Sequence, residues 1–226
     1  MIIITGAARG IGHFLFNEFE REDHETVAGT YHNTMPVGGS NRYYKVDVTK
    51  EDEVEHFAKQ CSEGCAIKLV HCAGINANAY LSNTKLADWE QVLAANTTSA
   101  FLLCKHSLPI MRRQKYGRIV FFSSVVPQLG VAGTSAYAAS KAALWGLAKI
   151  IAKENALENI TCNTLNLGYF NAGMINEIPE PHLPHIINSI PMKKLGAPIN
   201  IYYALRFLFL SDYTTGCQIN INGGLV

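Results

Sequence analysis

Two side chains capable of acid–base chemistry, Tyr137 and Lys141, stand four residues apart in a stretch whose pattern is helical. Residues at this spacing lie one turn apart on one face of a helix. A tyrosine has a pKa of about 10, so it is a poor acid–base catalyst at neutral pH unless a nearby positive charge favours its phenolate. Lys141 would supply that charge, and Ser124 would hydrogen-bond and polarise a substrate oxygen. An ordinary amphipathic helix that follows a strand-ending serine would show the same spacing.

An apolar run at residues 117–123, GRIVFFS, leads directly to Ser124 and has the length and the β-branched and aromatic content of a buried strand. Its end would bring Ser124 to the carboxyl edge of a sheet, where open α/β folds bind their ligands. Other short apolar runs predict strands at residues 1–4, 26–31, 42–47 and 66–74. Helical patterns fall between the strands, at residues 13–22, 51–61 and 86–114. This alternation predicts βαβ units, a parallel sheet and the α/β fold class.

Length and charge narrow the functional classes. The 226 residues fit a single domain, because α/β domains routinely reach this size. A formal net charge of +1 predicts neither nucleic acid nor an anionic membrane surface as a partner. No apolar run approaches about 18 residues and no signal peptide is visible, so we expect a cytoplasmic protein.

Cysteine and histidine spacing gives no prediction of a metal site. The six cysteines are scattered through apolar stretches and are expected to be reduced thiols. Cys61 and Cys65 have no second Cys or His pair at a partnering distance. His182 and His185 stand three apart, which fits a metal pair but is more typical of a solvated helix face.

A glycine-rich segment, TGAARGIG at residues 5–12, joins the first predicted strand to the first predicted helix. Gly6, Gly10 and Gly12 would let the backbone approach a pyrophosphate, and the helix N-terminus would present its N–H groups to it. The spacing is GxxxGxG, which differs from the usual GxGxxG dinucleotide fingerprint. Such glycines also occur for packing reasons alone. We favour phosphate binding because a strand precedes the segment and a helix follows it.

The residues after the second predicted strand bear on the choice of cofactor. No Asp or Glu occurs between Glu25 and Asp47, where NAD-binding units place a carboxylate on the adenosine ribose. A carboxylate there would repel a 2′-phosphate, and Arg9 is a suitable charge-assisted partner for that phosphate. We therefore predict NADP(H) in preference to NAD(H). The alternative is that Arg9 is a solvated loop residue.

Asn96 lies near the middle of the helical pattern at residues 86–114. Asparagine is unhelpful inside a helix and often hydrogen-bonds backbone or water instead. It is either a satisfied polar group of the core or a residue that lines a site.

Six of these features occur in the order and spacing of one known family. They are TGAARGIG at 5–12, DVT at 47–49, CAG at 72–74, Asn96, Ser124, and YAASK at 137–141. In this respect the chain resembles the short-chain dehydrogenase/reductase family, and within it the β-ketoacyl-acyl-carrier-protein reductases. The resemblance spans nearly the whole chain, and it implies a Rossmann-like, doubly wound parallel sheet in a single domain of residues 1–226.

The resemblance implies a Ser-Tyr-Lys-Asn tetrad. The residue at the position of Tyr137 is the general acid or base at the substrate oxygen, and the one at Ser124 orients that oxygen. The residue at Lys141 binds the nicotinamide ribose and lowers the pKa of the tyrosine, and the one at Asn96 holds a water in a proton relay.

The resemblance also implies a set of cofactor contacts. Gly6, Gly10 and Gly12 would hold the diphosphate, Asp47 and Val48 the adenine, and Ala73 and Gly74 would pass beside the cofactor. The complete set of predicted cofactor-binding residues is Gly6, Arg9, Gly10, Ile11, Gly12, Asp47, Val48, Ala73, Gly74, Tyr137, Lys141 and Gly168.

The chain departs from the family pattern at three places. His71 and Cys72 replace the two asparagines of the family's NNAG motif, so we expect the backbone path to survive and the side-chain hydrogen bonds to be lost. Leu167 replaces a proline before Gly168, and Ala172 replaces a threonine that bonds the nicotinamide carboxamide. One lost hydroxyl contact costs about 0.5–1.5 kcal/mol, which would weaken the cofactor's binding without abolishing it.

Residues 171–195 contain four prolines and a set of apolar side chains. Loops of this length inside compact domains are usually functional, and family members carry a mobile substrate lid here. We predict a lid that suits an apolar or acyl substrate. The alternative is a surface excursion with a core-facing helix at residues 182–189.

The leading hypothesis is an oxidoreductase that moves a hydride between NADP(H) and a carbonyl or secondary alcohol. Its first candidate substrate is a 3-oxoacyl thioester that an acyl carrier holds, and a secondary-metabolite ketone is the next. An alternative from another class is a protein that senses NADP(H) without turnover. Helices at residues 84–108 and 135–156 predict a homo-oligomer, a dimer or tetramer, although helices that cover a sheet are apolar too.

Overall fold

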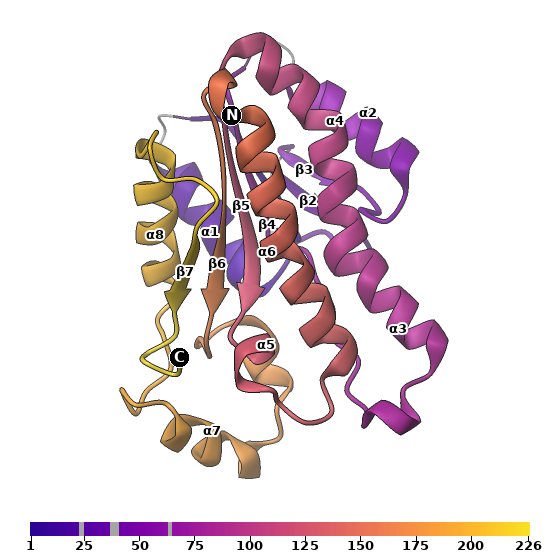
Figure 1. Cartoon of the computed structure of the whole chain (residues 1–226), viewed down its shortest axis with the longest axis vertical. Coiled ribbons are helices and arrows are strands. Elements are labelled where there is room, and N and C mark those ends of the chain that lie inside the picture. Colours follow the sequence, from indigo (N-terminus) through magenta and orange to yellow (C-terminus); the bar gives the residue numbers. More distant parts are fainter. Residues whose placement is uncertain (23–24, 37–40, 63–64) are drawn as a thin grey trace.

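Seven parallel strands form one sheet in the computed structural model, which describes residues 1–22, 25–36, 41–62 and 65–226 (Figure 1). Their order is β3-β2-β1-β4-β5-β6-β7, so the chain reverses direction across the sheet between β1 and β4. The strands are β1 Ile2–Thr5, β2 Val27–Tyr31, β3 Tyr43–Lys45, β4 Ile67–His71, β5 Gly117–Ser124, β6 Ile160–Leu167 and β7 Gln218–Ile221. Such a reversal places a crevice at the carboxyl ends of the strands. The predicted Rossmann-like, doubly wound α/β fold is confirmed.

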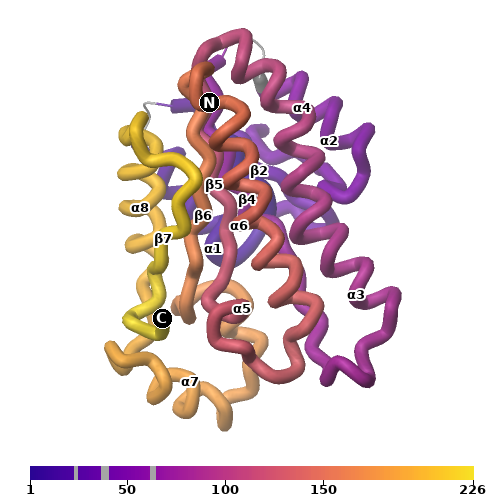
Figure 2. Tube along the Cα trace, viewed as in Figure 1, coloured from indigo at the N-terminus to yellow at the C-terminus, as the bar shows by residue number. Residues whose placement is uncertain are grey.

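Helices cover both faces of this sheet. They are α1 Gly10–Arg21, α2 Glu51–Ser62, α3 Leu86–Leu93, α4 Ser99–Gln114, α5 Val126–Leu129, α6 Ser135–Asn155, α7 Leu183–Ser189 and α8 Ile199–Leu210. Figures 1 and 2 show α1 and α8 on one face and α2, α4 and α6 on the other. Within the described ranges, none of the helices combines the length and apolar character needed to cross a bilayer.

Two apolar layers form the core, one on each face of the sheet. Alternate residues of β1 point to opposite faces, so Ile3 packs with side chains of α2, α4 and α6, whereas Ile2 and Ile4 pack with those of α1 and α8. Every residue of β5 and β6 is buried. Continuous burial of this kind is typical of the central strands of a parallel sheet that has helices on both faces, and in β6 it includes the polar residues Thr161, Asn163, Thr164 and Asn166.

The helical pattern at residues 86–114 is interrupted by a π-helical turn. Helix α3 ends at Leu93, residues Ala94–Thr98 form the π-turn, and α4 begins at Ser99. In this turn the backbone N–H of Ser99 bonds to the carbonyl of Ala94, five residues earlier. Asn96 lies inside the π-turn, and such turns frequently mark functional sites.

Two other predicted elements differ in extent. The strand expected to end at Asp47 ends at Lys45. The Asp47 carboxylate accepts hydrogen bonds from the backbone N–H and the hydroxyl of Thr49, 3.0 and 2.7 Å away, which favours a turn there. The helix of the alternative interpretation, at residues 182–189, is present as α7 Leu183–Ser189 after a 3₁₀ turn at Glu180–His182, but none of its residues is buried, so it does not face the core.

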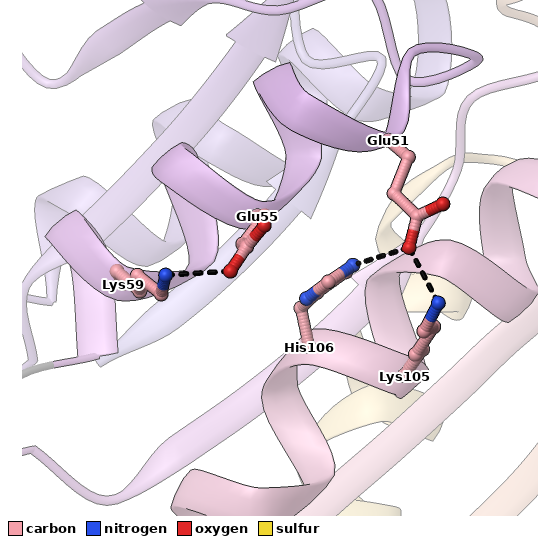
Figure 3. Close-up of polar contacts among 5 residues, drawn as sticks. All are labelled: Glu51, Glu55, Lys59, Lys105 and His106. Atoms are coloured by element: carbon pink, nitrogen blue, oxygen red, sulfur yellow. Dashed lines mark hydrogen bonds and ion pairs between the residues drawn. The ribbon is translucent and has the colours of Figure 1, made fainter.

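Ion pairs join α2 to α4 at the surface (Figure 3). Oε1 of Glu51 lies 2.5 Å from Nζ of Lys105 and 3.1 Å from Nε2 of His106, and these contacts lower the pKa of Glu51. Glu55 and Lys59 form a further pair within α2, at 2.5 Å. Exposed pairs contribute little stability. The packing of α2 on α4 therefore rests mainly on their buried apolar side chains.

Candidate active site

The carboxyl ends of β1, β4 and β5 and the first turns of α6 meet at one edge of the sheet. Thr5 ends β1 beside His71 of β4, and Ser124 ends β5. Helix α6 begins at Ser135, so Tyr137 and Lys141 lie in its first two turns. The predicted helical spacing of the Tyr–Lys pair is confirmed.

Lys141 is almost completely buried, with 3% of its surface exposed. Its Nζ donates a hydrogen bond to the carbonyl of Phe122 at 2.7 Å and lies 5.7 Å from the centroid of the Tyr137 ring. The hydroxyl of Ser123 donates to the Lys141 carbonyl at 2.9 Å, which fixes the helix against β5. Burial lowers the pKa of Lys141 to about 8, although Cys72 opposes this shift. The side chain is therefore still cationic at neutral pH, but near its titration point.

Tyr137 is half-buried beside Ser124. Burial raises the pKa of Tyr137 to about 12, and a hydrogen bond with the Ser124 side chain opposes that shift only in part. The resemblance implies a lowered tyrosine pKa, so the shift runs in the opposite direction, because desolvation, with smaller contributions from Cys72 and Tyr169, outweighs the hydrogen bond with Ser124. Oγ of Ser124 also accepts from the N–H of Val126 at 3.1 Å, which leaves its own proton free to be donated. The phenol thus carries a proton at neutral pH.

Asn96 is fully buried and uses both ends of its amide. Its Oδ1 accepts from the N–H of Ile75 at 2.8 Å, and its Nδ2 donates to the Ile75 carbonyl and to Oγ of Ser140, both at 2.9 Å. A methyl group added to Gly74 would lie 3.2 Å from the Asn96 Oδ1 and 3.3 Å from the Lys141 Nζ. Asn96 is therefore a satisfied core group that lies near Lys141.

The glycine turn between β1 and α1 has the geometry of a close backbone approach. Gly6 and Gly10 have positive φ angles of 66° and 56°. A Cβ on Gly6 would lie 2.8 Å from the Cα of Ala73, and a Cβ on Gly12 would lie 2.3 Å from the Gly6 carbonyl oxygen. The side chain of Arg9, the residue before α1, does not cap the helix. The first N–H groups of α1, that of Ile11 among them, are thus available to an anion.

The residues expected at the adenosine end are more exposed. The Arg9 side chain is 78% exposed, and its Nη1 lies 3.6 Å from Oε1 of Glu177. Burial raises the pKa of Asp47, but the hydrogen bonds from Thr49 and the charge of His32 outweigh it, so the net shift is downward. The Asp47 carboxylate lies 3.7 Å from Nε2 of His32.

The other expected contacts line the same edge. Val48 packs against the apolar layer on the α2 side, and the N–H of Ala73 donates to Oγ1 of Thr5 at 3.2 Å. A Cβ on Gly168 would lie 2.7 Å from the Cα of Asn222, so this position requires a glycine.

The expectation that no side-chain hydrogen bond survives at residues 71 and 72 is wrong for His71. Its ring bonds Oγ1 of Thr5 at 2.9 Å and Oγ of Ser99 at 3.2 Å. Sequence reasoning missed Thr5 and Ser99 as well. The sequence did contain a signal for these contacts. His71, whose ring has two hydrogen-bonding nitrogens, stands at the end of a predicted strand, in a motif where the family has two asparagines.

Among the described residues, no group of three or more His, Cys, Asp or Glu side chains is placed to hold a metal ion. The six cysteines are free.

The doubly wound sheet, the glycine turn after β1 and the polar side chains at its carboxyl edge define a dinucleotide-binding α/β protein. Comparison with known proteins narrows this class: the short chain dehydrogenase family matches residues 1–182. The chain therefore belongs to the short-chain dehydrogenase/reductase family. It is an enzyme of that family, which uses a nicotinamide cofactor.

Similar proteins cover nearly the whole chain. The 3-oxoacyl-(acyl-carrier-protein) reductase FabG of Buchnera aphidicola is 32% identical over 99% of this chain and 96% of its own length. The reductase MabA of Mycobacterium tuberculosis is 32% identical over 99% and 92%. FabG of Thermotoga maritima is 33% identical over 99% and 96%. The residues present fit a nicotinamide dinucleotide, because the N-terminus of α1 follows the glycine turn at the end of β1 and no side chain caps its first N–H groups.

Proposed function

We propose that this enzyme is an NADPH-dependent reductase of 3-oxoacyl thioesters, most suitably those held on an acyl carrier. The observation that carries the proposal is the placement of a protonated phenol, Tyr137, between the Ser124 hydroxyl and the buried ammonium of Lys141. The similarity to reductases named for 3-oxoacyl groups supports the substrate class.

In the proposed mechanism Tyr137 is the general acid. A pKa raised to about 12 keeps its proton in place until a substrate oxygen gains negative charge. Ser124 donates a hydrogen bond to the same oxygen and polarises the carbonyl. The bound reduced cofactor supplies the hydride. Lys141, cationic at neutral pH, stabilises the phenolate left after proton transfer.

Asn96 and Lys141 are the other two members of the proposed tetrad. Asn96 ties the main chain of Ile75 to Ser140, whose hydroxyl in turn donates to the Tyr137 carbonyl at 2.8 Å. This fixes the start of α6 in relation to the end of β4. The backbone of the proposed general acid is therefore linked, through Ser140 and Asn96, to the main chain of Ile75.

The proposed preference for NADP(H) rests on charge at the adenosine end. No Asp or Glu lies between Glu25 and Asp47, and the exposed guanidinium of Arg9 stands at the glycine turn. A 2′-phosphate would gain a charge-assisted partner there.

Residues 171–195 are proposed to act as a substrate lid within a single domain of residues 1–226. They include the 3₁₀ turn Gly173–Glu177 and α7, and Figure 1 shows α7 beyond the arrowheads of β5, β6 and β7 at the carboxyl edge. A Cβ on Gly10 would lie 2.7 Å from the Cα of Gly173, so the segment starts against the glycine turn. Met174 and Met192 expose apolar surface, which suits an acyl chain.

A panel of carbonyl substrates tests the proposal. The purified chain is mixed with NADPH and a ketone, an aldehyde, a quinone or a 3-oxoacyl thioester, and consumption is followed at the NADPH absorbance band. We expect the fastest consumption with the 3-oxoacyl thioester. Faster reduction of a secondary-metabolite ketone would reject the substrate class, and tight NADPH binding without any consumption would favour the sensor alternative. The homo-oligomer and the cytoplasmic location stay predictions.

A further inference from the structure

His71 is a fully buried histidine that stands between the glycine turn and the π-turn. It ends β4, next to Thr5 at the end of β1. Its Nδ1 lies 2.9 Å from Oγ1 of Thr5, and its Nε2 lies 3.2 Å from Oγ of Ser99, the first residue of α4. The ring thus touches elements that are far apart in sequence.

The hydrogen-bond partners fix where each proton lies. The Ser99 hydroxyl donates its single proton to the carbonyl of Ala95 at 2.6 Å. Its oxygen must therefore accept from His71, so Nε2 carries the ring proton and Nδ1 is an acceptor. The Thr5 hydroxyl then donates to Nδ1, while its oxygen accepts the N–H groups of Cys72 and Ala73, both at 3.2 Å. Only the tautomer with its proton on Nε2 gives all of these groups a hydrogen-bond partner.

The ring acts as a neutral bridge. Burial, with the charge of Lys141, lowers the pKa of His71 to about 3 against an opposing hydrogen bond with the Asn96 backbone, so the ring is neutral at neutral pH. A neutral histidine with both nitrogens bonded is a rigid connector between its two partners.

Ser99 closes the π-turn at its C-terminal end. Its N–H is used by the carbonyl of Ala94, so the hydroxyl supplies the donor that Ala95 would receive from that N–H in a regular helix. Asn96 is the residue after Ala95. The orientation of the Asn96 amide toward Ile75 and Ser140 therefore depends on a turn that His71 supports from β4.

We propose that His71 is a positioning residue for the reduction. Through Ser99 it holds the π-turn in the shape that directs the Asn96 amide to Ile75 and Ser140. Through Thr5 it connects that turn to β1, the strand that leads into the glycine turn. The inference rests on the proposed function, because the position of Asn96 affects the reaction only if the chain has that function. Histidine performs here a bridging role for which its two ring nitrogens, on opposite sides of the ring, are suited.

The decisive variant is Ser99→Ala, which removes the hydroxyl partner of the His71 Nε2 and leaves the Thr5 contact intact. Its matched control is Ser107→Ala, another buried serine of α4. We expect Ser99→Ala to lower kcat about tenfold while KM for NADPH changes less than about twofold, and Ser107→Ala to leave both unchanged. His71→Asn, whose shorter amide reaches Thr5 but not Ser99, should likewise lower kcat and leave KM for NADPH nearly unchanged. In the double variant its effect on kcat should not add to that of Ser99→Ala.

Two readouts do not need turnover. In protein labelled with ¹⁵N-histidine, the His71 signals should show the Nε2–H tautomer without titration from about pH 5 to 9. Backbone amides of residues 94–98 should exchange about tenfold faster in Ser99→Ala than in wild type or Ser107→Ala. An Nδ1–H tautomer, or equal exchange in both serine variants, would overturn the positioning role. If these two readouts hold but wild type reduces no carbonyl, the proposed function fails instead, and with it the catalytic meaning of the bridge.

Discussion

Two regions at the carboxyl edge of the sheet, the ends of β4 and β5 and the place where the glycine turn meets residues 171–195, hold their polar side chains in different ways. His71, Asn96 and Lys141, the buried group, are at most 3% exposed, and every one of them bonds a backbone or side-chain partner. Arg9 and Glu177, the surface pair, are 78% and 64% exposed and 3.6 Å apart. The proposed acid–base chemistry thus depends on buried, hydrogen-bonded groups. The proposed choice of cofactor depends on exposed charges, which solvent and salt screen.

This difference has an energetic consequence. Removing a partner from a buried polar network leaves a desolvated group without a hydrogen bond, which costs several times more than the loss of an exposed ion pair. Substitutions in the buried group should therefore change rates and stability strongly, and substitutions in the surface pair should shift cofactor preference by modest factors.

Lys141→Met should have the largest effect among substitutions that test this contrast. It removes the ammonium beside Tyr137 and leaves the Phe122 carbonyl without its donor. We expect kcat for carbonyl reduction to fall by about 10²–10³-fold, as for other groups that stabilise charge in the transition state. Lys149→Met, on the exposed side of the same helix, is the control and should keep full activity. Retention of more than about a tenth of wild-type kcat in Lys141→Met would show that the ammonium has no catalytic role.

The pH dependence of stability gives a smaller effect with a defined sign. Burial lowers the pKa of Lys141 to about 8 in the folded protein, below its ordinary value of 10.5. Between these values the unfolded chain binds more protons, so the contribution of Lys141 to the free energy of unfolding rises with pH. From about pH 7 to pH 10, the free energy of unfolding of wild type should rise relative to Lys141→Met by on the order of 2–3 kcal/mol. Urea titrations at each pH measure the free energy of unfolding of both proteins. A difference between wild type and Lys141→Met that does not change with pH would contradict the lowered pKa of Lys141.

Arg9→Ala should separate the two cofactors. If Arg9 binds the 2′-phosphate, its loss should raise KM for NADPH about tenfold and leave KM for NADH within about twofold. Glu177→Gln frees the guanidinium from its ion pair, so it should lower KM for NADPH by about twofold. Initial rates over a range of each cofactor measure both effects. Equal changes for NADPH and NADH in Arg9→Ala would assign this residue to the solvated loop.

Glu51→Gln should have the smallest effect of the series. Glu51 joins Lys105 and His106 at the exposed surface between α2 and α4. Because exposed pairs are screened by solvent, we expect kcat to stay within about twofold and Tm within about 2 °C. A large loss of either would mean that surface ion pairs, and not only the buried group, position this site.

Local patterns predicted the elements that carry the proposed tetrad. The four-residue spacing of Tyr137 and Lys141, the glycine turn and the apolar run before Ser124 are each visible within a few residues, because helical and strand periods are local properties. The π-turn was not predicted. Its shape depends on bonds from Asn96 to Ser140, 44 residues away.

Long-range partners explain the other differences. Thr5 and His71 are 66 residues apart, and only the pairing of β1 with β4 brings them together. The direction of the pKa shift at Tyr137 depends on how deeply α6 packs, which the order of residues does not reveal. The pairing of Arg9 with Glu177 likewise depends on how residues 171–195 fold back on the glycine turn.

The most direct test of the central claim is Tyr137→Phe, measured by single-turnover NADPH oxidation with a 3-oxoacyl thioester and by NADPH binding in the same preparation. Tyr203→Phe, an exposed tyrosine of α8, is the matched control. We predict that Tyr137→Phe slows the chemical step by about 10²–10⁴-fold, the contribution typical of a general acid, while the Kd for NADPH stays within about threefold. Oxidation of NADPH at a rate near that of wild type and Tyr203→Phe would contradict the assignment of Tyr137 as the proton donor.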